Sequence, residues 1–133
     1  MLSDAFSSAV EARDPEALAD ALAEDVRFLS PVVFRPYEGR DLVLTILSEG
    51  AMKVFEGFRY TDKVEQGDSA ALVFEAGVGG RELQGLDLLR FDGEGKVREL
   101  VVMVRPMSGL NALAAAMAER FEQLGLTPPS GGG

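Results

Sequence analysis

The sequence is most informative between residues 85 and 105, which read GLDLLRFDGEGKVRELVVMVR. Two apolar strands flank the turn Asp92-Gly93-Glu94-Gly95 and so predict a β-hairpin. Asp87 stands in the first strand, at a position where the pattern favours an apolar residue. A buried, unpaired carboxylate costs several kcal/mol or takes up a proton, so a chain that keeps one uses it or hydrogen-bonds it. Asp87 therefore marks a candidate pocket.

The register of this hairpin predicts the face on which Asp87 lies. A two-residue turn at Glu94-Gly95 pairs Arg90 with Glu99 and Asp87 with Val102. The Asp87 carboxyl group then faces inward among apolar side chains, and desolvation is expected to raise its pKa. By the same alternation the inner face also carries Leu72, Phe74 and Val104.

The rest of the chain predicts helices first and a long sheet afterwards. Capping residues predict helices that begin near residues 4, 15, 41 and 108, and period-two patterns predict strands over residues 25–30, 58–65, 70–78, 81–91 and 96–105. Residues 36–39 are predicted to form a loop. This order indicates an α+β fold, in which a curled antiparallel β-sheet (a cone or half-barrel) wraps around the N-terminal helices and a C-terminal helix follows. We expect residues 1–126 to form one domain and residues 127–133 to be a disordered tail.

Composition narrows the chemistry. The 133 residues include no cysteine and no histidine, and 22 acidic against 13 basic residues give a net charge of −9. Disulfides, thiolate nucleophiles, imidazole bases and Cys/His zinc sites are excluded, so acid–base chemistry would fall to Asp, Glu, Tyr, Lys or Arg. The acidity opposes binding to nucleic acid or to a membrane surface. No motif predicts a cofactor or a metal site, and no secretion signal is evident, so we expect a cytoplasmic protein.

The outer face of the predicted sheet is also apolar. Side chains there would lie in water unless another segment or a second subunit covered them. A homodimer through the outer sheet face is therefore expected. The residues concerned are Leu86, Leu88, Val101 and Met103.

Several motifs together resemble the nuclear transport factor 2-like superfamily. They are Phe28-Leu29-Ser30-Pro31, Tyr37-Glu38-Gly39-Arg40-Asp41, residues 85–97 and Val104-Arg105-Pro106-Met107-Ser108. The resemblance covers about residues 4 to 124 and is closest to small bacterial SnoaL-like proteins. It implies the cone fold but no single activity, because the superfamily includes ketosteroid isomerases, polyketide cyclases, dehydratases, epoxide hydrolases and plain binding proteins.

A comparison with the ketosteroid isomerases, residue by residue, tests one activity. Their general-base aspartate corresponds to Ser30, and their first-helix tyrosine corresponds to Phe6. Only their third catalytic group, an aspartate that works protonated, has a counterpart here, at Asp87. Steroid isomerisation by that mechanism is therefore not expected. The Asp–His design of the polyketide cyclases is also incomplete, since the chain has no histidine.

Asp87 is the candidate catalytic residue, and two interpretations of it stay open. Its neutral carboxyl group would donate a hydrogen bond to a ligand carbonyl or act as a general acid. Alternatively, Asp87 bonds Ser30, Tyr37 or a buried water and only holds the sheet together. Ser30 points inward, and Tyr37 is expected in a loop at the pocket mouth. The remaining predicted ligand-binding residues are Phe6, Met52, Phe55, Phe74, Val102 and Val104.

The sequence thus predicts a protein that binds an apolar small molecule in a pocket anchored by a buried aspartate. The alternative is a lyase, isomerase or cyclase that acts on an apolar carbonyl compound by proton transfer through Asp87. No second titratable group is predicted beside Asp87, which favours binding without chemistry. Whether the protein is an enzyme stays open at this point.

Overall fold

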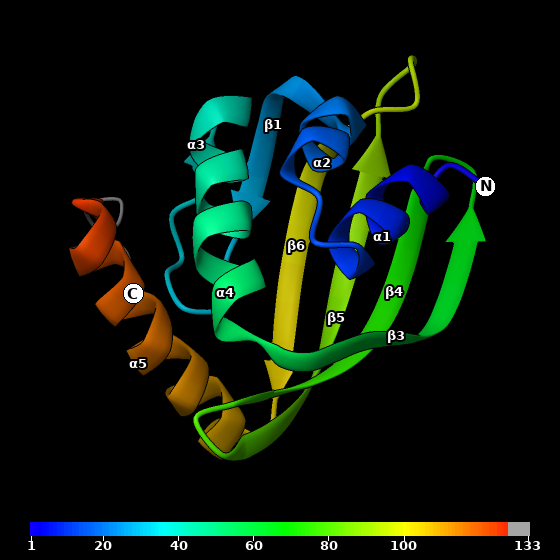
Figure 1. The fold of residues 1–133 in the computed structure, drawn as a ribbon. Helices are drawn as coiled ribbons and strands as arrows, with labels where there is room; N and C mark the ends of the chain where they lie inside the picture. The colour runs from blue at the N-terminus through cyan, green and yellow to red at the C-terminus, as the bar shows by residue number, and fades with distance from the viewer. Residues whose placement is uncertain (128–133) are drawn as a thin grey trace.

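A computed structural model describes residues 1–127 of the chain and has an α+β fold, as predicted (Figure 1). A curled sheet of six strands carries the helices on its concave side. The helical elements are α1 (Asp4–Glu11), α2 (Pro15–Ala21), α3 (Arg40–Thr45), the π-helix η1 (Ile46–Ala51), α4 (Met52–Val54) and α5 (Met107–Leu124). The strands are β1 (Leu22–Leu29), β2 (Tyr37–Glu38), β3 (Glu56–Gln66), β4 (Ser69–Val78), β5 (Arg81–Phe91) and β6 (Val97–Arg105). Most of the predicted tail, residues 128–133, lies outside the described residues.

The sheet has the order β2-β1-β6-β5-β4-β3. Strands β3 to β6 form the predicted antiparallel meander. Strand β1, however, runs parallel to β6, so the sheet is mixed rather than wholly antiparallel. The parallel pair joins segments about 70 residues apart, and a local pattern of alternation carries no information on such a partner.

The β5–β6 hairpin has the predicted register, with Arg90 opposite Glu99 and Asp87 opposite Val102. Its turn is different from the predicted two-residue turn. The Asp92 amide donates to the Lys96 carbonyl over 2.8 Å, which encloses a longer loop. Pairing then jumps between Arg90 and Phe91, where Arg98 is the extra residue of a β-bulge. The longer turn and the bulge offset each other, so the register beyond them is unchanged.

The first strand begins earlier than predicted and gains a partner. Leu22 belongs to β1 and pairs with Val97, with an irregularity before the regular pairing at Arg27. The predicted loop at residues 36–39 contains the short strand β2, in which Tyr37 pairs with Phe28. In both segments an apolar side chain is buried in the sheet, Leu22 in β1 and Tyr37 in β2. Each stretch is too short for its sequence pattern to indicate a strand.

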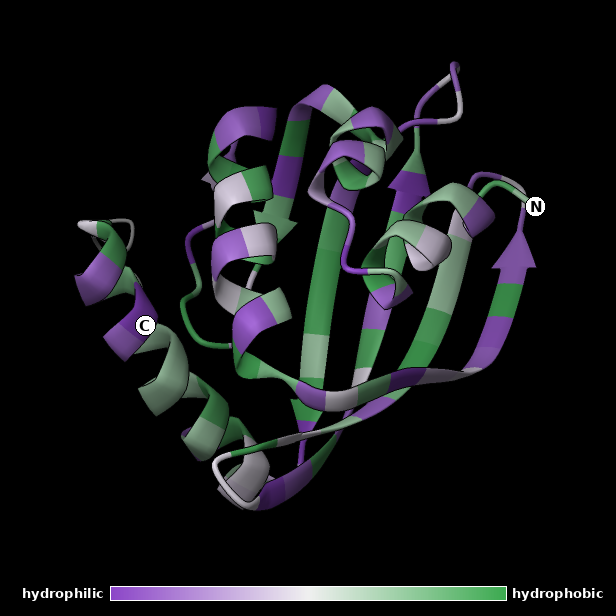
Figure 2. Cartoon of the chain, in the orientation of Figure 1, coloured by the Kyte–Doolittle hydropathy of each residue, from purple (hydrophilic) through white to green (hydrophobic). Residues whose placement is uncertain are grey.

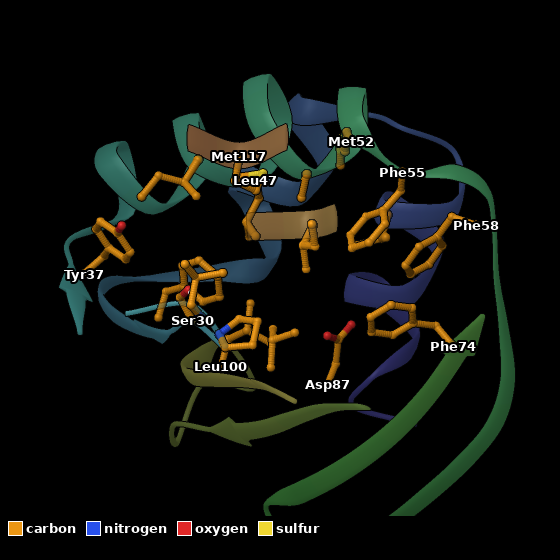
Figure 3. A pocket seen from close by; sticks show the side chains of 18 of the residues that line it. Ser30, Tyr37, Leu47, Met52, Phe55, Phe58, Phe74, Asp87, Leu100 and Met117 are labelled. Carbon is orange, nitrogen blue, oxygen red and sulfur yellow. The ribbon is translucent and has the colours of Figure 1, made fainter. Parts of the chain in front are cut away.

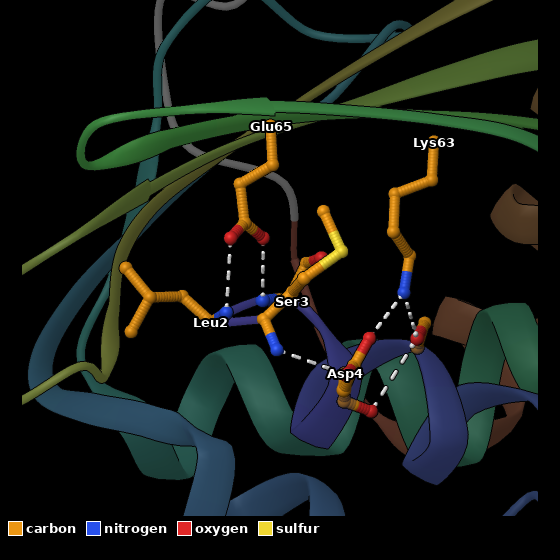
Figure 4. Close-up of polar contacts among 7 residues, drawn as sticks. Leu2, Ser3, Asp4, Lys63 and Glu65 are labelled. Atoms are coloured by element: carbon orange, nitrogen blue, oxygen red, sulfur yellow. Dashed lines mark hydrogen bonds and ion pairs between the residues drawn. The ribbon is translucent and has the colours of Figure 1, made fainter.

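The N-terminus of α1 is capped from β3 rather than by its own residues. The side chain of Ser3 makes no capping hydrogen bond. Instead Glu65 accepts hydrogen bonds from the amides of Leu2 (3.1 Å) and Ser3 (3.0 Å), and Lys63 pairs with Asp4 (Figure 4). A carboxylate at a helix N-terminus satisfies free amides and is favoured by the helix dipole. These contacts fix α1 against the sheet beside the pocket.

Helix α2 begins as predicted, with Asp14 accepting from the amides of Glu16 and Ala17 at 3.1 Å. The next helix runs from Arg40 to Val54, close to its predicted start near residue 41. Its middle, η1, is a π-helix. A Cβ at Gly50 in η1 would lie 2.7 Å from Cε of Met117, so the missing side chain lets α5 approach.

The core consists of two clusters of buried side chains on the concave side of the sheet. The larger one joins α1–α4 to the sheet, and the smaller one lies beneath α5 around Phe74 and Leu113. In Figure 2 the strands β4 and β6 are largely apolar. On the outer face Met103 is 50% exposed, while Leu86, Leu88 and Val101 are half-buried.

Between residues 1 and 127, none of the helices has the length and apolar character needed to cross a membrane. The acidic side chains of the same region form no group of three or more that could hold a metal ion.

Candidate functional site

A cavity of about 160 Å³ lies between the concave face of the sheet and the helical elements α1, α2, η1, α4 and α5 (Figure 3). Its lining is mostly apolar. The polar exceptions are Arg13, Ser30, Tyr37 and Asp87. Of the predicted site residues, the structure brings together in this lining Phe6, Ser30, Tyr37, Met52, Phe55, Phe74, Asp87 and Val102.

Asp87 lies on the floor of the cavity and points into it (Figure 3). Strand β5 places it between Leu72 of β4 and Val102 of β6, its direct partners in the sheet. The residue is only 7% exposed. Its Oδ2 accepts a hydrogen bond of 2.7 Å from the hydroxyl of Tyr60. The carboxyl group is therefore buried, with one hydrogen-bond donor among residues 1–127.

Burial dominates the acid–base behaviour of this pair. Desolvation raises the pKa of Asp87 from 3.8 to about 7, and the hydrogen bond from Tyr60 opposes that rise. Burial, followed by the neighbouring Asp87 charge, raises the pKa of Tyr60 well above 10.0. The predicted direction for Asp87 is thus confirmed. Near neutral pH the Asp87 carboxyl group is therefore present in both its protonated and its ionised form, while the Tyr60 phenol stays protonated.

Tyr60 is the partner that the sequence analysis missed, and the prediction of no titratable group beside Asp87 is wrong. Tyr60 pairs with Phe74 across β3 and β4, and its hydroxyl reaches over β4 to β5. Its alternation with Phe58 was a signal for the inner face. The pairing of β3 with β4 contains two irregularities, which prevented a register from being carried across to β5.

Ser30 and Tyr37 lie at the opposite end of the cavity from Phe55, Phe58 and Phe74 (Figure 3). The Ser30 hydroxyl accepts a hydrogen bond of 3.0 Å from the Val32 amide. The Tyr37 ring is buried between Phe28 and Phe121, with centroid distances of 5.9 and 6.0 Å, so it lies deeper than the predicted pocket mouth. The hydrogen bonds of residues 1–127 join neither hydroxyl to Asp87, so that part of the structural interpretation is wrong.

Aromatic rings form the wall on the Asp87 side of the cavity. Phe58 and Phe74 stack at 4.7 Å, and Phe55 meets Phe74 edge-on at 5.6 Å. The Phe74 ring lies over Gly85, where a Cβ would be 2.0 Å from Cζ of Phe74. Glycine at position 85 thus provides the space that the ring occupies.

Val104, predicted to line the pocket, is not among the lining residues. It pairs with Gly85, and it packs against the core cluster that contains Phe74. Because the Phe74 ring covers Gly85, it separates this part of the sheet from the cavity. Arg105 next to it bonds Gln84 at 3.3 Å on the outer face, as the register predicts.

Arg13 lines the cavity and is a polar residue that the sequence analysis did not identify. It lies between α1 and α2 with a φ of 52°, and its Nη2 donates to the Phe55 carbonyl over 3.0 Å. No capping or periodic pattern indicates such a contact. It connects the α1–α2 turn to the end of α4 at the cavity wall.

Comparisons with known proteins agree with this fold. A family model described as a SnoaL-like domain matches residues 3–100. A steroid delta-isomerase from Pseudomonas aeruginosa is 40% identical with a TM-score of 0.84, over 90% of this chain and 88% of that chain. An uncharacterized protein with a cystatin-like fold from Silicibacter pomeroyi is 31% identical with a TM-score of 0.86, over 91% and 85% of the two chains. An NTF2-like protein of unknown function from Mesorhizobium loti, 21% identical with a TM-score of 0.71 over 79% and 88%, shares the fold. No curated protein matches the chain.

Proposed function

The chain belongs to the SnoaL-like domain family and has a nuclear transport factor 2-like fold, and on that premise we propose that it binds an apolar small molecule in the cavity above β5. One observation carries the proposal. The cavity is lined almost entirely by apolar side chains, and its floor holds a single buried carboxyl group, Asp87. Apolar walls with few convergent polar groups are typical of small-molecule sites.

The proposed contacts with the ligand come from both ends of the cavity. On the Asp87 side, apolar contacts would come from Phe55, Phe74 and Val102. At the far end, the Ser30 hydroxyl accepts from the Val32 amide and keeps its own proton free to donate to a ligand. The Tyr37 hydroxyl would supply a second polar contact there. Phe6 and Met52 would cover the ligand from the helices.

The Tyr60–Asp87 pair favours a second candidate function, a lyase, isomerase or cyclase acting on an apolar carbonyl compound. An acid with a pKa of about 7 suits general acid–base catalysis. The 40% identical neighbour is described as a steroid delta-isomerase. Against the steroid mechanism, Ser30 and Phe6 stand where the resemblance places the catalytic base and tyrosine of ketosteroid isomerases. Any turnover would therefore proceed through Asp87 without that base.

A partner is also proposed for the outer face of the sheet. Met103 is half-exposed there, beside the half-buried Leu86, Leu88 and Val101. A second copy of the chain on this face would remove their apolar surface from water, and a homodimer is our proposal. Sedimentation that shows only monomer across micromolar concentrations would contradict it. A cytoplasmic location stays a prediction of the sequence.

Isopropylbenzene is a suitable probe of the binding function, followed through the methyl resonances of Met52 and Met117. We expect saturable shifts at both methionines. Ala114→Phe adds a ring at a lining position of α5 and should weaken binding at least fivefold. Ala115→Phe adds the same ring at the next, exposed position and should leave affinity unchanged. Absence of shifts at the methionines, or equal effects of the two variants, would contradict the proposal.

Asp87→Asn separates binding from catalysis, because it keeps the shape of the side chain and removes its acidic proton. The substrates would be a panel of carbonyl compounds that includes a ketosteroid. Loss of turnover in a variant that folds normally would support the enzyme. No turnover by the wild-type protein on the whole panel would favour binding alone.

A further inference from the structure

The two oxygens of the Asp87 carboxyl group have different surroundings. Oδ2 accepts the 2.7 Å hydrogen bond from Tyr60. Among the residues that the structure describes, no donor is bonded to Oδ1, and this oxygen is not fully buried. Since Asp87 lines the cavity, Oδ1 is the oxygen available to a ligand.

Few charged groups face Asp87 from the elements packed against it. Its sheet neighbours are Leu72 on β4 and Val102 on β6. The lining residues of α1, α2, η1, α4 and α5 are apolar. Apart from Asp87, the ionisable residues that line the cavity are Arg13 and Tyr37.

Besides Asp87, Tyr60 has a second acidic neighbour, Glu11 of α1. Glu11 accepts a hydrogen bond of 3.4 Å from the Tyr60 backbone amide. The Glu11 charge adds to the effects that raise the pKa of the phenol. Tyr60 therefore stays protonated and is the one group among residues 1–127 that is hydrogen-bonded to the Asp87 carboxyl group.

A permanent donor at Oδ2 determines where the carboxylic acid carries its own proton. The Tyr60 hydroxyl fills the position at Oδ2, so the proton of neutral Asp87 lies on Oδ1 and faces the cavity. In that state Oδ1–H offers one directed donor to an oxygen acceptor. When Asp87 ionises, the same oxygen becomes an acceptor and repels carbonyl oxygens.

The size of the cavity limits the ligand. Its volume of about 160 Å³ is close to that of the ~150 Å³ apolar cavity that binds benzene in an engineered protein. Drug-sized sites are larger, about 300–1,000 Å³. A single six-membered ring with a short substituent fits this space, and a tetracyclic steroid exceeds it.

From these observations we propose that Tyr60 positions Asp87 as a directed hydrogen-bond donor for a single-ring ligand with one carbonyl oxygen. This inference rests on the proposed function, since it assumes that the cavity binds a ligand. Tyr60 acts through Asp87 and does not line the cavity, so it is a positioning residue. The ligand class would be small aromatic or alicyclic ketones.

Three probes of nearly the same shape test the donor: acetophenone, isopropylbenzene and the cation of 1-phenylethylamine. At acidic pH we expect acetophenone to bind about fivefold more tightly than isopropylbenzene, the factor that one ordinary hydrogen bond represents. The preference should disappear with a midpoint near pH 7, the pKa of Asp87. The affinity of the amine cation should instead increase as the pH rises and Asp87 becomes ionised. Affinities would be measured by calorimetry or by methyl shifts of Met52 and Met117.

Tyr60→Phe tests the positioning role. Removing a hydrogen bond to the ionised form should move the midpoint for acetophenone upward by more than half a pH unit. Tyr37→Phe removes a hydroxyl from the same cavity without contact to Asp87, so it should keep the midpoint whatever it does to affinity. Asp87→Asn keeps a donor amide and should bind acetophenone without pH dependence.

The outcomes distinguish the directed donor from the proposed ligand binding on which it rests. If none of the probes binds, both are wrong. If acetophenone and isopropylbenzene bind equally at every pH, the cavity binds ligands but the directed donor is refuted. An unmoved midpoint in Tyr60→Phe would make Tyr60 merely structural. Testosterone binding more tightly than acetophenone at the same site would refute the single-ring ligand.

Discussion

The two faces of the β5–β6 hairpin place their carboxylates in opposite environments. On the outer face Glu99 lies 3.6 Å from Arg90 and 3.7 Å from Arg27, with solvent at hand. On the inner face Asp87 lies among apolar side chains, and within residues 1–127 its one hydrogen-bond donor is the Tyr60 hydroxyl. An exposed ion pair contributes little because water competes for both partners, whereas a buried acid responds strongly to each donor it has. The inner carboxylate is therefore the one whose environment determines chemistry.

The largest expected effect comes from replacing the inner acid. Because burial raises the folded pKa of Asp87 from 3.8 to about 7, the contribution of this group to stability is greatest below the lower value and falls as pH rises to the upper one. The total fall from this group is about 4 kcal/mol. Asp87→Asn has no such proton to lose. Its free energy of unfolding relative to wild type, from urea denaturation, should rise by about that amount between acidic and mildly alkaline pH. If the difference in free energy of unfolding between the variant and wild type does not change with pH, the pKa of Asp87 is not raised by burial and the two faces do not differ in this way.

Gly85→Ala is next, because it disturbs the ring beside the inner acid. A Cβ there would lie 2.0 Å from Cζ of Phe74, which is packed against other rings. Overpacking of this kind should cost about 2–3 kcal/mol in urea denaturation. Gly77→Ala is the matched control in β4, where the nearest atom would be 3.6 Å away, and should change stability by less than about 0.5 kcal/mol. Equal costs would mean that the ring has room to move.

Tyr60→Phe should have a somewhat smaller effect that depends on pH. The hydrogen bond to the ionised carboxylate is stronger than that to the neutral acid, so the loss should be about 2 kcal/mol above the Asp87 pKa and about 1 kcal/mol below it. Urea denaturation at two pH values measures both. A loss that does not change with pH would indicate that the phenol only fills space.

The smallest effect is expected on the outer face. Glu99→Gln removes the charge that Arg27 and Arg90 share and should cost at most about 1 kcal/mol. The cost should decrease further in high salt, because exposed charges are screened. A larger, salt-independent loss would show that the outer face is as sensitive as the inner one.

The contrast between the two faces was largely predictable from sequence. Alternation within β5 and β6 is a local property, so it placed Asp87 inside and the Arg90–Glu99 pair outside correctly, even though the turn has a different geometry. The helical order and the cone fold followed from capping residues and turn signals in the same way. These features depend on neighbours in the chain or on one hairpin.

What could not be predicted depends on contacts between distant segments. Tyr60 reaches Asp87 across an intervening strand whose pairing contains irregularities. Strand β1 pairs in parallel with a strand far along the chain. Val104 shares the parity of Asp87, yet the covering of Gly85 by Phe74 separates it from the cavity. Alternation along a strand predicts the face of the sheet on which a side chain lies, but it does not predict which other side chains cover it.

The most direct test of the account is a pH titration of the Asp87 carboxyl carbon by NMR. We predict a midpoint near 7 in the wild-type protein, since burial outweighs the hydrogen bond from Tyr60. In Tyr60→Phe the midpoint should move upward. A wild-type midpoint at or below 3.8, the ordinary value for aspartate, would contradict the buried neutral acid on which the proposed site depends.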